Sequence, residues 1–159
     1  LGSVVAQTLK DIEIIVVDDA STDGSRPLIE EFVRADPRVR YEVGPGTGSA
    51  SAARNVGLDL ATGDYLAFLD ADDFFAPTML EQLYEQARYD EADIVLTKFR
   101  TVDYVTGDTT PADWSLRLQY FPPRTPISPD DLGDHLFFAV NPAAWNKLFR
   151  TEFIRASGL

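Results

Sequence analysis

The sequence predicts an α/β domain with a largely parallel sheet, and two observations support this prediction. Short β-branched segments alternate with amphipathic segments through roughly the first hundred residues, which is the order expected of β-α-β units. Acidic residues directly follow two of the predicted strands, and ligands of such sheets bind beyond the carboxyl ends of the strands. We therefore expect functional residues at one edge of the sheet.

The predicted strands are short. Residues 12–17 are almost wholly apolar and β-branched, as expected of a strand that is buried on both faces of a parallel sheet. Residues 38–43 and 93–99 also favour strands, and residues 65–69 predict a central strand. A hairpin or edge strand is expected around the turn at 106–109.

Helical spacing of apolar residues predicts the intervening helices. One follows residue 25 with Pro27 in its first turn, a second covers residues 50–61, and a third begins at Pro77. Six of the ten prolines lie between residues 111 and 142, so irregular loops are expected there. Ser128 and Asp131 predict a capped helix start within that region.

Composition limits the possible classes of protein. The chain has 159 residues, with 14 Lys and Arg against 26 Asp and Glu, and a formal charge of −12. This length suits one domain with a sizeable core, and the charge argues against nucleic acid as a partner. The absence of cysteine excludes disulfides and thiolate metal sites, and the apolar runs are too short for a membrane span.

Two acidic clusters follow the strands that end near residues 17 and 69. The first is Asp18 with Asp19, and the second is Asp70 with Asp72 and Asp73. Carboxylates at one sheet edge repel one another unless a cation offsets their charge, and their hard oxygen atoms suit Mg²⁺ or Mn²⁺. The alternative is that each cluster only caps the following turn or helix.

Other residues near these clusters are weaker candidates. The glycine-rich loop at 44–48 is either a phosphate cradle or a flexible connection, because it lacks the Lys-Ser/Thr ending of a P-loop. Arg54 and Asn55 lie on the first turns of the next predicted helix and suit a diphosphate. Trp145 is expected to anchor an irregular segment, and Lys147 is a candidate contact for a phosphate.

The sequence contains a series of short motifs: QTL at 7–9, IIVVDDAS at 14–21, TDGS at 22–25, SAARNVGL at 51–58, ATGDY at 61–65, FLDADD at 68–73 and WNKLFR at 145–150. Together they resemble the family 2 glycosyltransferases, specifically the branches that build bacterial surface polysaccharide and teichoic acid. Their order and spacing match that family throughout residues 7–93, and the last motif resembles a later segment of it.

The resemblance implies a Rossmann-like, three-layer GT-A fold and inverting transfer of a sugar from a nucleotide-diphosphate donor to a glycan or lipid-linked acceptor. Asp18 or Asp19 then recognises the base, Asp70 lies near the ribose, and Asp72, with Asp70, holds Mg²⁺ or Mn²⁺. The implied donor-binding residues are Asp18, Asp19, Ser21, Arg54, Asn55, Asp70, Ala71 and Asp72, with Asp73, Trp145 and Lys147 as weaker candidates.

The resemblance also implies a division of the chain and a location. Residues 1–100 form the nucleotide-sugar core, and residues 101–159 begin the acceptor side of a single domain. The full-length protein is expected in the cytoplasm, peripheral at the inner face of the membrane.

The sequence departs from the family pattern at both ends. The family's additional first strand is absent, and the acidic pair that supplies the catalytic base is expected beyond Leu159. We therefore expect most of a donor site without a complete active site. A missing strand should leave a strand edge exposed, through which two copies can associate.

Three alternatives remain open on the sequence. A phosphoacceptor receiver domain would use Asp18, Asp19 and Asp70 with Lys98 or Lys147, but its chain would end earlier. A nucleotidyltransferase would also need carboxylates and Mg²⁺, but no Lys/Arg-bearing glycine loop follows the first strand. A non-catalytic sugar-nucleotide-binding module is the third.

Overall fold

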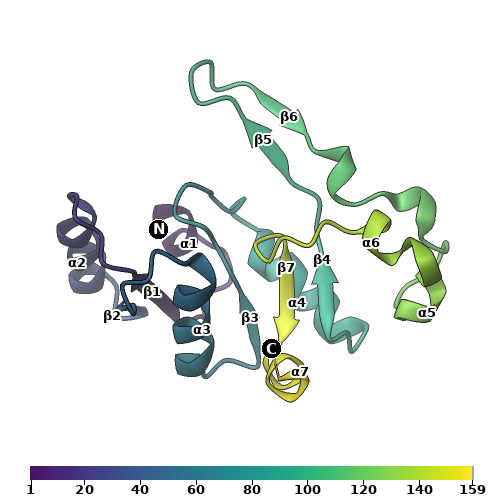
Figure 1. The fold of residues 1–159 in the computed structure, drawn as a ribbon, viewed down its shortest axis with the longest axis horizontal. Helices are drawn as coiled ribbons and strands as arrows, with labels where there is room; N and C mark the ends of the chain where they lie inside the picture. Colours follow the sequence, from purple (N-terminus) through teal and green to yellow (C-terminus); the bar gives the residue numbers. More distant parts are fainter. Residues whose placement is uncertain (159) are drawn as a thin grey trace.

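The computed structural model describes residues 1–158 and shows a mixed α/β architecture (Figure 1). Three-residue 3₁₀ turns occupy Asp113–Ser115, Leu118–Tyr120 and Gly133–His135. The helices are α1 (Gly2–Val5), α2 (Ser25–Ala35), α3 (Ala50–Leu60), α4 (Met79–Tyr89), α5 (Pro129–Leu132), α6 (Leu136–Ala139) and α7 (Thr151–Ser157). The strands are β1 (Ile14–Asp18), β2 (Val39–Val43), β3 (Tyr65–Ala67), β4 (Ile94–Leu96), β5 (Arg100–Val102), β6 (Thr109–Pro111) and β7 (Lys147–Arg150).

The strands β1 and β2 form a two-stranded parallel sheet in which Ile14 lies opposite Val39. The helix α2 connects them, as predicted for a β-α-β unit, and Pro27 lies in its first turn. The helix α3 then leads to β3, with Ser49 as its N-cap. The predicted elements of this half are confirmed.

The second sheet corrects the expectation of a mostly parallel arrangement. Its strand order is β3-β7-β4, and β7 runs antiparallel to both neighbours. The segment that forms β7 had not been predicted as a strand. Its location also means that the C-terminal residues pack with the first hundred, so residue 100 is not a structural boundary.

The main hydrophobic core lies between α4 and this second sheet. It consists of Leu83, Ala87, Val95 and Leu148, all of them buried. The apolar side of α4 supplies the first two, which lie four residues apart on one helix face. Burial against β4 and β7 therefore holds the C-terminal strand in the sheet.

An open cleft of about 1120 Å³ separates the two sheets. Within residues 1–158, β1 pairs only with β2, and β3 pairs only with β7 on that side of the cleft. Ile15, Val16 and Val17 are only half-buried, although their composition predicted burial on both faces. The cleft explains this difference, because no strand of the described residues covers the second edge of β1.

The backbone groups along the cleft are directed into it. Ile14 donates to the Arg38 carbonyl at 2.8 Å, and alternate residues of a parallel strand direct their N–H and C=O groups to opposite sides. Ile15 and Val17 therefore direct theirs away from β2. On β3, the Asp64 carbonyl points towards β7, because it accepts from the Thr151 N–H at 2.9 Å. The same alternation therefore directs the backbone N–H and C=O groups of Tyr65 and Ala67 away from β7.

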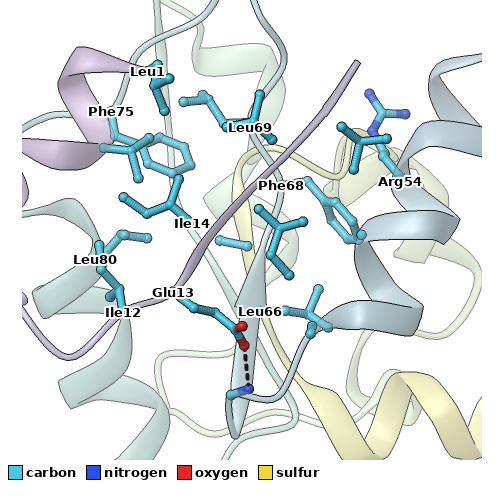
Figure 2. A pocket seen from close by; sticks show the side chains of 18 of the residues that line it. Leu1, Ile12, Glu13, Ile14, Arg54, Leu66, Phe68, Leu69, Phe75 and Leu80 are labelled. Atoms are coloured by element: carbon cyan, nitrogen blue, oxygen red, sulfur yellow. Dashed lines mark hydrogen bonds between the residues drawn. The ribbon is translucent and has the colours of Figure 1, made fainter. Parts of the chain in front are cut away.

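Side chains hold the two sheets together at the closed end of the cleft. The Glu13 carboxylate accepts from the Thr62 N–H at 2.5 Å, the Thr62 hydroxyl at 2.9 Å and the Gly63 N–H at 3.0 Å. Figure 2 shows one of these bonds below the apolar lining. The buried Gln7 side chain similarly joins the N-terminal segment to α4, donating to the Ala76 carbonyl and accepting from the Leu80 N–H.

The remaining segment is irregular, as its prolines predicted. The strands β5 and β6 form the predicted hairpin, which projects from the rest of the chain (Figure 1). The predicted capping of α5 is confirmed, since the Ser128 N–H donates to the Asp131 carboxylate at 2.8 Å. None of the helices in residues 1–158 has both the length and the apolar character needed to cross a membrane.

Replacing Leu148 with Ala should destabilise the chain by about 2–5 kcal/mol, because the substitution leaves a cavity between α4 and β7. Leu148 is 6% exposed. Urea unfolding measures the change in free energy. Phe137→Ala is the matched control, since Phe137 is 89% exposed and should change stability by about 0.5 kcal/mol or less. Equal effects of the two substitutions would contradict the assigned core.

The contribution of Asp36 to stability should disappear in acid. Hydrogen bonds from the Arg38 side chain, then from its N–H, lower the pKa of Asp36 to about 2. Because the folded pKa is below the unfolded one, this stabilisation is present above about pH 4 and is lost as the pH falls towards 2. Urea unfolding of the wild type and Asp36→Asn tests this: the difference in stability should shrink across that range, and a constant difference would contradict it.

Candidate functional site

The open end of the cleft brings together residues from α3 and from the end of β3. Arg54, Asp70 and Ala71 line it there. The other eight candidates are not among the lining residues: Asp18, Asp19, Ser21, Asn55, Asp72, Asp73, Trp145 and Lys147. Figure 2 shows Arg54 beside Phe68, at the opposite end from Glu13. Three of the residues predicted from the sequence therefore lie together at this end of the cleft.

An ion pair between Arg54 and Asp70 is the main polar contact of this end. The Arg54 Nη2 atom lies 2.5 Å from Asp70 Oδ1, and the side chains are 29% and 34% exposed. The helix α3 carries the Arg and the loop after β3 carries the Asp, so the pair also connects the two sides of the cleft. An arginine held in this way retains further N–H donors for an anion.

The carboxylates after β3 lie close together. Burial, then the charges of Asp72 and Asp70, raises the pKa of Asp73. Asp72 and Ala71 are exposed, and within residues 1–158 Asp72 makes no hydrogen bond or ion pair to another side chain. Asp72 and Asp73 are therefore the carboxylates of this cluster that are accessible to a ligand.

The cluster fits a cation that is shared with a ligand, but not a metal site made by protein alone. No group of three or more His, Cys, Asp or Glu in the described chain is arranged to hold a metal ion. Mg²⁺ commonly takes one or two carboxylates and completes its shell with phosphate oxygens and water. Asp72, with Asp70 beside it, matches this donor set.

Asp18 is buried at the end of β1 and is held by neighbours on two elements. Its carboxylate accepts from the Ser21 N–H at 2.9 Å and from the Tyr41 hydroxyl at 3.1 Å. The hydrogen bonds from Ser21 are the main cause that lowers the pKa of Asp18. Tyr41 was not among the site residues predicted from the sequence. The parallel register of β1 and β2 brings it to Asp18, because it places Tyr41 opposite Val16.

Asp19 has a different environment from its neighbour. Its carboxylate accepts from backbone N–H groups of the loop at 46–49. This contact corrects the phosphate-cradle interpretation of that loop, because the donors that would hold a phosphate are already bonded to Asp19. Ser21 and Asn55, the remaining candidates of this half, are exposed.

The last two candidates along the chain, Trp145 and Lys147, contact neighbouring parts of the protein. The Trp145 ring packs edge-on against Phe99 with centroids 4.4 Å apart, as expected of an anchor. Lys147 is buried, and its Nζ donates to the carbonyls of Asn141 and Ala143 and to Asn146 Oδ1. With three donors in use, and with burial lowering its pKa to about 8, Lys147 is not directed at a phosphate, contrary to expectation.

Comparison with known proteins decides between the classes that the sequence left open. The family model described as "Glycosyl transferase family 2" matches residues 1–150. The chain belongs to glycosyl transferase family 2. A receiver domain and a nucleotidyltransferase are thereby excluded as the class of this protein, and Lys98 pairs with Asp113 at 3.2 Å instead of facing the carboxylate cluster.

The relatives of this family 2 chain include bacterial glycosyltransferases. It is 34% identical over 161 residues to the putative glycosyltransferase EpsH of Bacillus subtilis, covering 100% of this chain and 44% of EpsH. It is 38% identical over 112 residues to the glycosyltransferase GlyG of Streptococcus pneumoniae, covering 65% of this chain and 37% of GlyG. The chain therefore spans less than half the length of these relatives.

Solved structures support the GT-A fold of this family 2 chain. The crystal structure of residues 1–349 of S. aureus TarS matches with a TM-score of 0.74 at 21% identity, covering 99% of this chain and 43% of that one. The same protein in complex with UDP-GlcNAc matches with a TM-score of 0.64 at 22% identity, covering 99% of this chain and 42% of that one. The predicted α/β, GT-A-type fold is confirmed.

Proposed function

We propose that the open end of the cleft binds the diphosphate of a nucleotide-sugar donor, and that the protein transfers the sugar with inversion at the anomeric carbon. The observation that carries this proposal is the Arg54–Asp70 ion pair beside the exposed Asp72. A diphosphate needs cationic groups and N–H donors, and Arg54 supplies a planar set of donors. Family membership and the UDP-GlcNAc complex of the TarS neighbour support a nucleotide-sugar donor.

Each candidate residue receives a role from its location. Asp18 is held by Ser21 and Tyr41 at the tip of β1, which suits recognition of the base. Asp70 and Ala71, where β3 gives way to a loop, suit contact with the ribose. Asn55 is exposed beside Arg54 on the same helix, and these two residues face the diphosphate in this proposal.

The carboxylates after β3 would hold a divalent cation, either Mg²⁺ or Mn²⁺. Asp72 is the main ligand, Asp70 the second, and Asp73 a neighbour whose pKa is raised by burial and then by the charges of Asp72 and Asp70. Such a cation stabilises the negative charge that develops on a departing nucleoside diphosphate. The chain's own task is to orient that leaving group through Arg54 and Asp72.

The acceptor and the setting of the reaction are part of the same proposal. We infer a glycan or lipid-linked acceptor in cell-surface polysaccharide synthesis, at the cytoplasmic face of the membrane. One relative, 33% identical over 160 residues and covering 94% of this chain and 43% of itself, is the cholesterol galactosyltransferase of Borreliella burgdorferi, whose name states a lipid acceptor. The expected catalytic base beyond Leu159 stays a prediction, as does the functional division at residue 100.

Calorimetric titration tests the donor site. UDP, GDP, CDP and their sugars are titrated into the chain with and without Mn²⁺, and at least one should bind more tightly with the metal. Asp72→Asn should weaken the metal-dependent binding by roughly 10- to 100-fold while the chain stays folded. Asp103→Asn is the matched control, because Asp103 holds a turn of the projecting hairpin.

Two results would contradict this proposal. The first is an absence of binding of every nucleotide at millimolar concentration to a folded sample, and the second is an unchanged metal effect in Asp72→Asn. Hydrolysis of the donor by the full-length protein separates an enzyme from a non-catalytic binding module, since only an enzyme turns over.

We also propose that the unpaired strand edges along the cleft allow two copies to associate. Exposed edges with free N–H and C=O groups are sites of strand pairing, and a lysine on an edge opposes it. Light scattering should show dimers that increase with concentration, and Val16→Lys should reduce them. Val43→Lys on β2, where Val43 is 65% exposed, should leave dimerisation unchanged. Monomer alone at all concentrations would contradict this interface.

A further inference from the structure

The Asp19 carboxylate lies on the concave side of the loop at 44–49, and the backbone of that loop encloses it. Successive N–H groups that point at one anion form a concave binding site of the kind that often holds phosphate. Here the anion is a side chain of the same protein. The donors are the N–H groups of Gly46 and Gly48, each at 2.6 Å, Ser49 at 3.2 Å and Thr47 at 3.3 Å, with the Thr47 hydroxyl at 3.4 Å.

The glycines of the loop fit it closely around this carboxylate. Gly46 and Gly48 have φ of +70° and +68°, a region that residues with a Cβ rarely adopt. A Cβ on Gly44 would lie 2.8 Å from Asp19 Oδ1, so a side chain there would displace the carboxylate. The glycines therefore leave room for the Asp19 carboxylate, and the carboxylate in turn accepts hydrogen bonds that hold the loop in this conformation.

The loop also sets the start of the helix that carries Arg54. Ser49 is the N-cap of α3, and its hydroxyl accepts from the Ala52 N–H at 3.4 Å. Ser49 itself donates to Asp19, so the carboxylate contacts the first residue of the cap. Five residues further on, Arg54 reaches across to Asp70 at 2.5 Å.

We propose that Asp19 is a positioning residue, which fixes the loop at 44–49 and thereby places Arg54 for the donor diphosphate. This inference rests on the proposed donor site. It gives the two adjacent aspartates separate tasks: Asp18 faces the base, and Asp19 acts through the loop without touching the donor.

The charge of Asp19 suits this task. Burial raises its pKa, but the N–H donors of Gly46, Gly48, Thr47 and Ser49 outweigh this effect, and the pKa lies below its usual value. An Asn at this position would turn an NH₂ group towards N–H donors and would offer a single acceptor oxygen. Asp19→Asn therefore changes little in size but breaks the match with the loop.

The first test measures amide hydrogen exchange by NMR in the 159-residue chain. In Asp19→Asn the amides of residues 46–49 should exchange roughly tenfold faster or more, because each loses a bond to a charged acceptor. The control Asp103→Asn removes a carboxylate that accepts from Val105 and Thr106 and should leave residues 46–49 unchanged. Unchanged exchange at residues 46–49 in Asp19→Asn overturns the proposal.

The second test separates positioning from direct contact with the donor. If Asp19 only positions Arg54, Asp19→Asn should weaken binding of UDP and CDP by the same factor, and the loss should shrink in an Arg54→Ala background. A changed ratio of UDP to CDP affinity, or an equal loss in both backgrounds, overturns the proposal. If the wild type binds none of UDP, GDP, CDP and their sugars, the proposed function fails, while the exchange measurement still decides the role of Asp19.

Discussion

Side chains, rather than a continuous ladder of backbone hydrogen bonds, join the two sheets of this chain. At one end of the cleft the Glu13 carboxylate bonds to Thr62 and Gly63, and at the other end Arg54 bonds to Asp70. Both contacts use a charged group, and hydrogen bonds of this kind are stronger than neutral ones. The Glu13 contact joins the segment before β1 to the segment before β3, and the Arg54 contact joins α3, which packs on β1, to the loop after β3.

The acidic residues of the candidate site differ in whether the protein itself supplies partners for their carboxylates. Hydroxyl and N–H donors stabilise the charged carboxylates of Asp18 and Asp19, and Arg54 offsets the charge of Asp70. Within residues 1–158, the carboxylates of Asp72 and Asp73 lack such a partner, and both residues are exposed. An incoming cation therefore meets two carboxylates without an internal countercharge, beside the ion pair of Arg54 and Asp70.

The sequence predicted local elements well and their pairing less well. The β-branched run after residue 12 and the helical spacing in α2, α3 and α4 are local signals, and each marked its element. The strand β7 was missed because its partners, β3 and β4, lie far away in the sequence, and only tertiary burial of Leu148 reveals them. For the same reason, the sequence did not predict the ion pair between Arg54 and Asp70, which lie on different elements. The role of Asp19 depended on the shape of a glycine-rich loop, which residue types alone do not specify.

The order of strands in the second sheet has a consequence for how the chain is made. The middle strand, β7, joins residues near 65 and 95 to residues near 148, so the strand that links β3 and β4 is synthesised last. Until it leaves the ribosome, β3 and β4 have no partner between them and their apolar faces lack Leu148. Strands that are far apart in the sequence pair slowly, and their edges stay exposed until the pairing is complete. The N-terminal unit of β1, α2 and β2 is under no such delay, so the two halves of the cleft are expected to form at different times during translation.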